Sequence, residues 1–255
     1  MHVIDLNADL GETVDTPDGT VPTADDEAMF AVISSASIAC GGHAGDAASM
    51  ADAAARASRT GVAIGAHPSY ADRENFGRVR VEVDPATLQR QLEEQFAALR
   101  AAGADIRYVK PHGALYHAAG GDPATAGAVT AAVAALAAEL GRPVPLLGLG
   151  AQLEQAAADA GIPFVREAFL DRGYLPDGSL VPRGMPGDLV HHPAEAAARA
   201  VHLVETGQLI AIDGSMVRTE AGSLCLHGDS AGAVETAHAV RRALDAAGIR
   251  VRAPW

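Results

Sequence analysis

The segment Val3–Glu12, which reads VIDLNADLGE, passes directly from an apolar run into a group of polar side chains. Its first half is apolar enough for a buried β-strand, and Asn7, Asp9 and Glu12 come at the carboxyl end of that strand. Polar groups in this position are typical of α/β proteins, because the carboxyl ends of parallel strands meet at one edge and build the site there. The same pattern, an apolar strand followed by a polar turn, is repeated along the chain.

Other short apolar runs are also suited to buried parallel strands. They are followed by polar turns such as Gly41–Asp46 (GGHAGD), Gly65–Tyr70 (GAHPSY) and Lys110–Gly113 (KPHG). The expected further strands cover residues 38–40, 62–64, 108–109, 145–147, 164–165, 209–212 and 224–226.

Helices are expected between these strands. Three of them begin at a polar residue followed by proline and end at a glycine, at 84–103, 122–141 and 192–207. Others are expected near 25–35, 47–59, 151–160 and 230–247. Alternating strands and helices imply βαβ units and a parallel sheet, and seven or eight units in this length favour a closed (β/α) barrel, with residues 1–255 as a single domain.

The composition excludes several classes of protein. The formal net charge of −13 argues against nucleic acid and anionic membranes as partners. Cys40 and Cys225 lie in apolar runs, which indicates reduced core residues rather than a disulfide. A strand is expected from His2 onward, which leaves no room for a signal peptide, and no apolar run is expected to reach membrane-spanning length. The expected location is the cytoplasm.

Lys110 is the only lysine of the chain, whereas arginine supplies the other basic groups. A position that keeps lysine among so many arginines is expected to need a compact ammonium group. Lys110 could face an anion or a carbonyl of the substrate. The alternative is an ion pair inside the barrel with Asp9 or Glu12, which would lower the pKa of the carboxylate.

Asp9, His43 and His112 come from three different strand ends and could meet across the barrel mouth. Aspartate and histidine are ligands that zinc or manganese accept, so a divalent metal site is one interpretation. A metal-free acid/base group is another. The structural alternative is that His43 caps the following helix and His112 hydrogen-bonds to a loop.

Further polar groups are candidates for substrate or anion binding. The glycines of the GGHAGD turn (Gly41, Gly42 and Gly45) and Asp46 lead into a helix, where backbone N–H groups can hold a phosphate or carboxylate, although a plain tight turn would look the same. The segment Asp171–His192 has the length and composition of a lid or of a crossover. The remaining candidates for substrate or anion binding are Asn7, Glu12, His67, Tyr70, Arg78, Arg166 and Arg172. His227 and Asp229 follow the last strand and are candidates for catalysis.

Two nucleotide-binding motifs are absent. The sole lysine is followed by Pro111, so the chain has no P-loop, and any nucleotide must bind in another way. No G-x-G-x-x-G follows a strand, so a nicotinamide cofactor is not expected.

Taken together, eight segments resemble the LamB/YcsF family, the A subunits of bacterial ATP-dependent 5-oxoprolinases. They occur in the family order and span nearly the whole chain. The chain departs from the usual family pattern at Gly42, at Ser37 and at His117. The matching segments are Asp5–Glu12, Ile38–Asp46, Gly65–Tyr70, Asn75–Arg78, Val109–Tyr116, Arg166–Tyr174, Asp177–Arg183 and Cys225–Asp229.

The resemblance implies an irregular, seven-stranded TIM-like barrel related to glycoside hydrolase and deacetylase barrels. It also implies that 5-oxo-L-proline is opened to L-glutamate while ATP, with Mg²⁺, is hydrolysed to ADP and phosphate. Subunits B and C of the 5-oxoprolinase would be the partners. In such a scheme Lys110 and the Gly41–Gly45 turn would hold developing charge. Asp9, His43 or His112 would act on water, and His227 with Asp229 would move a proton.

Two other functions remain open at this point. The first is a metal-dependent deacetylase or amidohydrolase that acts on a small amide or carbohydrate without ATP. The second is a non-catalytic scaffold subunit of a hydrolase complex, which would tolerate alanine at Asp9, His43 and Lys110.

Overall fold

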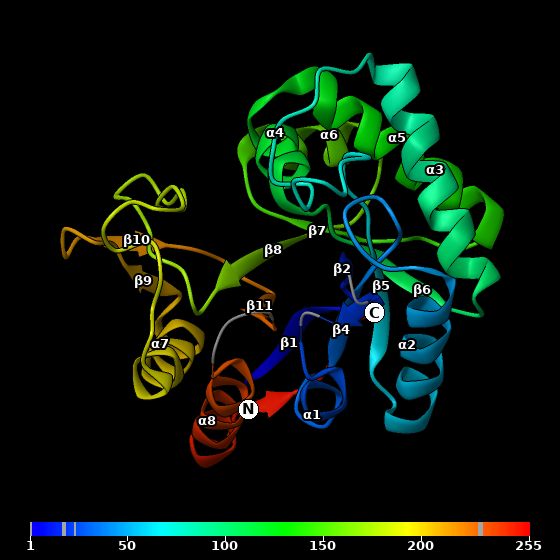
Figure 1. The fold of residues 1–255 in the computed structure, drawn as a ribbon. Helices are drawn as coiled ribbons and strands as arrows, with labels where there is room; N and C mark the ends of the chain where they lie inside the picture. The colour runs from blue at the N-terminus through cyan, green and yellow to red at the C-terminus, as the bar shows by residue number, and fades with distance from the viewer. Residues whose placement is uncertain (1, 17–18, 23, 229–231) are drawn as a thin grey trace.

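Seven parallel strands close into a barrel in the computed structural model, which describes residues 2–16, 19–22, 24–228 and 232–255. Neighbouring strands pair in the order β1-β4-β5-β6-β7-β8-β11, and β11 pairs back onto β1 (Figure 1). The closed seven-stranded barrel is therefore confirmed. Its strands are β1 (Val3–Leu10), β4 (Ser35–Ala39), β5 (Ala63–His67), β6 (Ile106–Val109), β7 (Leu146–Gly148), β8 (Phe164–Phe169) and β11 (Ser223–His227).

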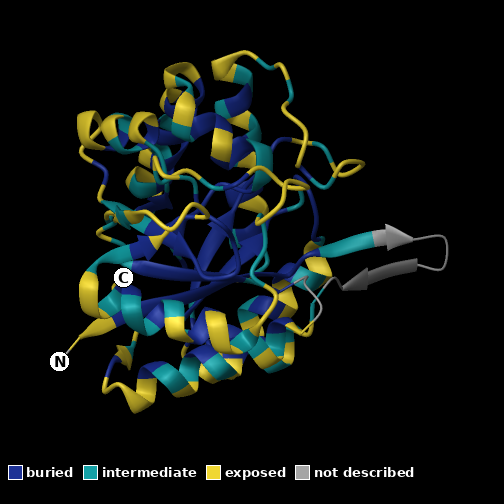
Figure 2. Ribbon diagram, turned by 90° about the vertical axis from the view of Figure 1, so that its left-hand side faces the viewer, coloured by how far each residue is buried: buried dark blue, intermediate teal, exposed yellow. Residues whose placement is uncertain are grey.

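Helices surround the buried barrel, and Figure 2 shows them buried on one side and exposed on the other. Two of the three predicted N-caps are confirmed: Asp84 and Asp122 each accept a hydrogen bond from a backbone N–H three residues on, at 3.0 Å. His192 begins helix α7 (Pro193–Thr206) without a side-chain cap hydrogen bond. Gly141 and Gly207 end their helices in the left-handed conformation. The helices are α1 (Asp26–Phe30), α2 (Ala47–Thr60), α3 (Pro85–Ala101), α4 (Gly113–Gly121), α5 (Pro123–Leu140), α6 (Ala151–Asp159), α7 (Pro193–Thr206) and α8 (Ala233–Ala246).

Four features differ from the expectation. The apolar run at 209–212 is not a barrel strand, because β9 (Gln208–Ile210) pairs antiparallel with β10 (Met216–Arg218) in a separate hairpin. Helix α4 was not predicted, since its sequence GALYHAAGG contains three glycines and has little apolar periodicity. The first loop forms a second hairpin, β2 (Thr13–Thr16) with β3 (Gly19–Pro22), and a short β12 (Arg250–Val251) pairs with β1.

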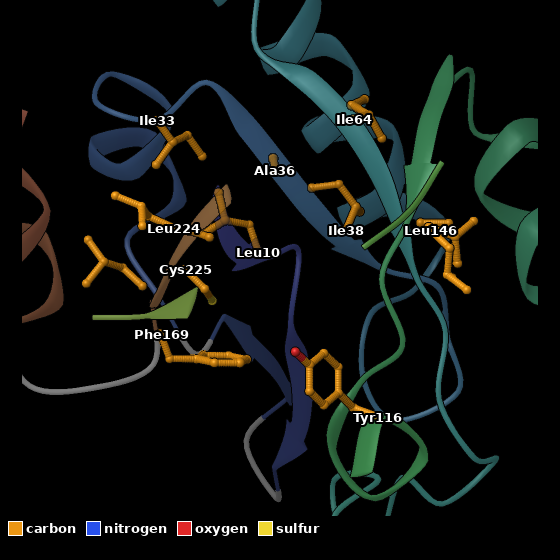
Figure 3. Packing of buried hydrophobic residues seen from close by; sticks show 14 of the residues in the cluster. Leu10, Ile33, Ala36, Ile38, Ile64, Tyr116, Leu146, Phe169, Leu224 and Cys225 are labelled. Atoms are coloured by element: carbon orange, nitrogen blue, oxygen red, sulfur yellow. The ribbon is translucent and has the colours of Figure 1, made fainter. Parts of the chain in front are cut away.

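Polar side chains fill much of the interior of the barrel, and apolar side chains cover its outer face under the helices. Along β1 the side chains of Asp5, Asn7 and Asp9 point inward and hydrogen-bond there, whereas Leu6 and Leu10 are fully buried in the hydrophobic core. Figure 3 labels Leu10, Leu224 and Ile33 among the buried hydrophobic residues of this outer layer. Because side chains alternate along a strand, every second residue of β1 reaches the interior.

The amino-terminal end of the barrel is closed by polar and aromatic contacts. Asp5 accepts hydrogen bonds from Ser34 at 2.7 Å and Ser35 at 2.6 Å, and burial raises the pKa of Asp5 to about 6. The indole N–H of Trp255 donates to Ser35 at 2.9 Å, and its ring stacks on Tyr108 at 4.3 Å. This closure leaves the carboxyl-terminal mouth as the open end.

Gly65 of β5 faces the Tyr108 ring so closely that a methyl group at Gly65 would lie 2.3 Å from it. We expect Gly65→Ala to lower the free energy of unfolding by about 1–3 kcal/mol, because the ring has to move within a packed interior. Gly127→Ala is the matched control, since nothing lies within 4 Å of the new methyl group inside helix α5. That control should leave stability unchanged or raise it. Chemical denaturation of both variants tests this, and equal stabilities would contradict the contact.

One expectation about membranes needs correction. Helix α5 is long and apolar enough to cross a membrane, by length and composition. In the structure it packs against α3, α4 and α6, and 44% of it is buried. Its apolar composition is therefore accounted for by packing in the helical layer of the barrel.

Candidate active site

Lys110 is the centre of a buried ionic network inside the barrel. Its Nζ donates to Asp9 Oδ1 at 2.7 Å and to Asn7 Oδ1 at 3.1 Å, lies 2.9 Å from Glu167 Oε1, and contacts Cys225 Sγ at 3.1 Å. Burial alone would lower the pKa of Lys110, but these neighbours outweigh it and hold that pKa well above its usual value.

The ammonium group of Lys110 is therefore engaged by the protein itself. Of the two interpretations from the sequence, the structure shows the internal ion pair with Asp9, and Glu12 takes no part in it. Asn7 holds the network together, since its Nδ2 donates to Glu167 at 3.0 Å and to Ser223 at 2.8 Å. Lys110 still lines the cavity, so its charge acts on whatever binds there.

Asp9 connects the lysine network to a group of histidines. Its Oδ2 lies 3.4 Å from His67 Nε2, while Oδ1 is bound to Lys110. Burial would raise the pKa of Asp9, but His67 and Lys110 hold it well below its usual value. Asp9 is thus a permanently ionised carboxylate. A carboxylate that holds its charge so firmly is a weak proton acceptor, so it is better suited to orienting groups than to general-base catalysis.

Three histidines and one carboxylate form a compact group at the barrel mouth. His43 Nε2 lies 3.0 Å from Glu12 Oε1, and His112 Nδ1 lies 3.0 Å from His67 Nε2 and 3.6 Å from the same glutamate oxygen. One candidate ligand atom from each of the four residues fits within a span of 4.8 Å, and all four residues are buried. The group could hold a metal ion. It differs from the expected set, because Glu12 and His67 belong to it and Asp9 does not.

The tautomers of two of these histidines follow from their outer partners. His67 Nδ1 lies 2.7 Å from the carbonyl oxygen of Lys110, and His112 Nε2 lies 2.9 Å from that of Phe76. A carbonyl oxygen only accepts, so each of these nitrogens carries the proton. His112, which burial keeps neutral, therefore has its lone pair on Nδ1, and this nitrogen lies 3.0 Å from His67 Nε2.

Burial keeps two of the imidazoles neutral. It lowers the pKa of His43 and of His112 well below the usual value, and the neighbouring histidines add to the effect. The two rings stack in parallel with centroids 3.6 Å apart. Neutral imidazole is the form that binds metals. His43 Nδ1 has no hydrogen-bond partner among the described residues.

A strained loop places the carbonyl that orients His112. Phe76 has a φ of 54°, which is unusual for a residue with a side chain, and Gly77 follows at 62°. A methyl group at Gly77 would lie 2.8 Å from the Cβ of His43, so only glycine fits. Strain of this kind persists where the surroundings fix it, and here it directs the Phe76 carbonyl at the imidazole.

One cavity of about 370 Å³ is lined by members of both groups and by His227. The members are Glu12, His67 and His112 of the histidine group and Asp9 and Lys110 of the lysine network. The cavity has the size of a site for a small molecule. Arg78 lines it as predicted, and Arg172 lines it too, but the Arg172 guanidinium donates to the carbonyl oxygens of Asp188 and Val181 and so fastens its own loop. The segment expected to be a lid contributes part of the wall. Its lining residues are Leu180, Val181, Pro182 and Arg183.

Several candidate residues lie away from this cavity. In the Gly41–Asp46 turn the N–H groups of Gly41 and Gly45 donate to the carbonyl oxygens of Ala44 and Thr13, so these two groups are not available to an anion. Asp46 caps helix α2 with its own carboxylate. The turn instead serves packing: a methyl group at Gly42 would lie 2.4 Å from Gln95, and Gly41 and Gly45 have φ values of 93° and 82°.

Two further candidates line other cavities, and one cannot be placed. Tyr70 is buried beside Arg80 and Asp122, and Arg166 pairs with Glu154 beside a second cavity. Asp229 lies outside the described residues. Sequence reasoning left two inward-pointing acids unassigned, Glu167 beside Lys110 and Asp171 beside His227. Both follow the apolar start of β8, so their place at a strand end was a usable signal.

The fold and the site together define a class: a parallel (β/α) barrel whose reactive groups gather at the carboxyl ends of the strands, as in barrel enzymes. The chain belongs to the LamB/YcsF family, which matches residues 4–254. This confirms the resemblance seen in the sequence.

Relatives that carry a name agree with this assignment. The chain is 44% identical to the A subunit of 5-oxoprolinase from Cutibacterium acnes over 99% of both chains. It is 46% identical to the corresponding A subunit from Streptomyces griseus, with 98% of this chain and 99% of that one covered. The crystal structure of a lactam utilization protein from Thermus thermophilus superposes with a TM-score of 0.89 at 41% identity, covering 99% of this chain and all of that chain.

Proposed function

We propose that this chain is the A subunit of an ATP-dependent 5-oxoprolinase, which opens 5-oxo-L-proline to L-glutamate in the cytoplasm together with subunits B and C. The observation that carries the proposal is the cavity at the barrel mouth, where Lys110, Asp9, two histidines of the histidine group and His227 line the same space. The names of full-length relatives supply the substrate class, a lactam.

The chemistry of a lactam explains why ATP would be needed. A lactam carbonyl is a poor electrophile. Transfer of the γ-phosphoryl group to the carbonyl oxygen, with release of ADP, would activate the ring carbon. Water then adds to that carbon, the C–N bond breaks as the nitrogen takes a proton, and a second water releases phosphate from the acyl phosphate. The products are glutamate, ADP and phosphate.

The residues around the cavity have distinct tasks in this scheme. Lys110 places a positive charge next to the reacting oxygen, and Asp9 and Glu167 fix that charge in position. Arg78 and Arg183 line the same cavity and can attract the carboxylate of the substrate or a phosphate. His67, which is bound between Asp9 and the carbonyl of Lys110, can orient an attacking water.

The test is glutamate release from 5-oxo-L-proline, measured with this chain alone and with the candidate partner subunits, each with and without ATP. Release that requires both ATP and this chain supports the proposal. The no-ATP arm identifies a hydrolase that acts without a nucleotide. No release in any mixture, with this chain folded as judged by circular dichroism, would overturn it.

We also propose that Glu12, His43, His67 and His112 bind a divalent metal ion. His67 Nε2 and His112 Nδ1 lie 3.0 Å apart, and each of the four residues can bring one ligand atom to within 4.8 Å of the other three. The backbone carbonyl oxygens of Lys110 and Phe76 accept hydrogen bonds from the His67 and His112 rings. Such bonds commonly orient histidines that bind metals. An ion held there would polarise a carbonyl oxygen and make a bound water more acidic.

We expect the purified chain to bind about one equivalent of Co²⁺ or Zn²⁺, and His67→Ala to weaken the affinity by about 100-fold or more. The readouts are the visible absorption of bound Co²⁺, elemental analysis, and the rise in Tm on adding metal. His238→Ala, an exposed histidine of α8, is the control and should bind as the parent chain does. Equal metal binding by the His67 variant and the parent would contradict the assignment.

The same ligand group favours a second candidate function, a metal-dependent amide hydrolase that needs no ATP. It would release glutamate, or cleave another small amide, in the arm without nucleotide, and a chelator would abolish the activity. Release that depends on ATP and survives chelation would exclude it.

A further inference from the structure

Asp171 is a buried carboxylate that follows β8 and holds His227 by two hydrogen bonds. Its Oδ2 accepts the backbone N–H of His227 at 3.0 Å and lies 2.8 Å from the ring Nδ1. Burial would raise the pKa of Asp171, but His227 lowers it below its usual value, so Asp171 is an ionised acceptor. An ionised carboxylate cannot donate, and Nδ1 therefore carries the proton.

The remaining nitrogen of His227 is left for the cavity. The ring lies nearly parallel to Phe169, with an interplanar angle of 16° and centroids 5.5 Å apart, which fixes its plane. Within the part of the chain that the structure describes, Nε2 has no hydrogen-bond partner, and His227 lines the cavity. Several charged or titratable groups share the cavity or act on the ring. They are Asp9 of β1 and Glu12 after it, His67 of β5 and Arg78 after it, Lys110 and His112 after β6, and Asp171, Arg172 and Arg183 after β8.

We propose that Asp171 is the positioning residue that makes His227 the acid for the ring nitrogen of the lactam. As the C–N bond breaks, its electron pair stays on nitrogen, which takes the proton from Nε2 of the imidazolium. The neutral imidazole then regains a proton from solvent. This inference rests on the proposed lactam hydrolysis. It names His227 as the donor of the proton that the lactam nitrogen takes.

The pH dependence of turnover separates this role from a structural one. Burial would lower the pKa of His227, but the charge and hydrogen bond of Asp171 outweigh it and raise that pKa above its usual value. Since His227 must be protonated to act as the acid, the parent chain should stay active to higher pH than a variant without the Asp171 charge. We expect Asp171→Asn to lower kcat by about 100-fold at neutral pH and to move the alkaline limb of the profile to lower pH.

A substrate analogue tests the step itself. In the ring-sulfur analogue of 5-oxoproline the leaving group is a thiolate, which needs no proton. We expect Asp171→Asn and His227→Gln to act on this thiolactone nearly as well as the parent does, while both fail on the lactam. Asp245→Asn, an exposed carboxylate of α8, is the control and should match the parent on both substrates. Equal losses on lactam and thiolactone, with an unmoved alkaline limb, would overturn the proposal.

A measurement on this chain alone keeps the inference separate from the proposed function. Nitrogen-15 NMR of the histidine rings reports the tautomer and the titration of His227 without any substrate. We expect the Nδ1–H form and a fall of the His227 pKa in Asp171→Asn. If the His227 pKa falls in Asp171→Asn but the complex releases no glutamate, the proposed function is wrong and the coupling of Asp171 to His227 is confirmed. If glutamate is released but the pKa does not move, the role of Asp171 fails.

Discussion

Lys110→Met is expected to lower the free energy of unfolding by about 3–5 kcal/mol and to abolish turnover. The methionine removes the only cation that touches both Asp9 Oδ1 and Glu167 Oε1 in the described structure. Two buried carboxylates would then lose the ammonium group that they share, and this loss of charge compensation, more than the lost contacts, sets the size of the effect. Denaturant unfolding followed by circular dichroism measures it.

A matched surface variant and a double variant make this result interpretable. Arg107→Met changes a half-exposed cation of the same strand, β6, and should alter stability by no more than about 0.5 kcal/mol. Adding Glu167→Gln to Lys110→Met removes one of the two buried negative charges that Lys110 compensates in the parent chain. The double variant should therefore be more stable than Lys110→Met alone. A Lys110→Met protein as stable as the parent would show that the network is not buried as described.

Lys110→Arg distinguishes charge from shape at the same position. The guanidinium keeps the positive charge, so the loss of stability should be smaller than with methionine. It is planar and larger than an ammonium group, and it has to fit among Asn7, Asp9 and Cys225. We expect a folded protein with a severe loss of turnover, and near-normal glutamate release would contradict the role of Lys110.

Asp9→Asn is expected to lower kcat by about 1,000-fold while the chain stays folded. The asparagine keeps the size of the side chain and leaves Lys110 paired with Glu167, so the cost in stability should be small. What is lost is the negative charge between Lys110 and His67. Because the pKa of Asp9 lies well below its usual value, this charge is present throughout the neutral range. The loss should therefore be independent of pH below the alkaline limb and should grow above it, because Asp9 is one of the charges that raise the pKa of His227.

The control for Asp9→Asn is Asp159→Asn, an exposed residue at the end of helix α6 that contacts only Gln155 among the described hydrogen bonds. Its turnover should equal that of the parent chain in the assay of the complete complex. Metal binding should be measured in parallel, because Asp9 is not in the ligand group. If Asp9→Asn kept normal turnover, the carboxylate would have no part in the reaction.

Much of the fold was predictable because its signals are local. The Asp84-Pro85 and Asp122-Pro123 pairs begin helices for reasons of capping and backbone geometry that need no tertiary contacts. The apolar run at 209–212 misled the assignment for the opposite reason. Its length and composition suit a barrel strand, but pairing with β10 is a tertiary event that no local pattern encodes.

The location of the site could be predicted from the sequence, whereas the individual contacts within it could not. Strand-end position correctly indicated where Asp9, His67 and Lys110 would gather. It could not show that Glu12 would turn toward His43, since that depends on the path of the loop after β1. The glycines of the Gly41–Asp46 turn looked like an anion cradle because glycine permits both close packing and ligand approach, and only the donors of the turn distinguish the two.

The single lysine at the centre of the barrel also offers a spectroscopic reporter. Biosynthetic labelling with ¹⁵N-lysine would place one labelled side-chain amine in the whole chain, at Nζ of Lys110. That ammonium is enclosed by hydrogen-bond acceptors, so its protons should exchange with solvent slowly enough for a direct NMR signal. A change in that one resonance would report the arrival of lactam, nucleotide, metal or a partner protein, without any mutation in the site.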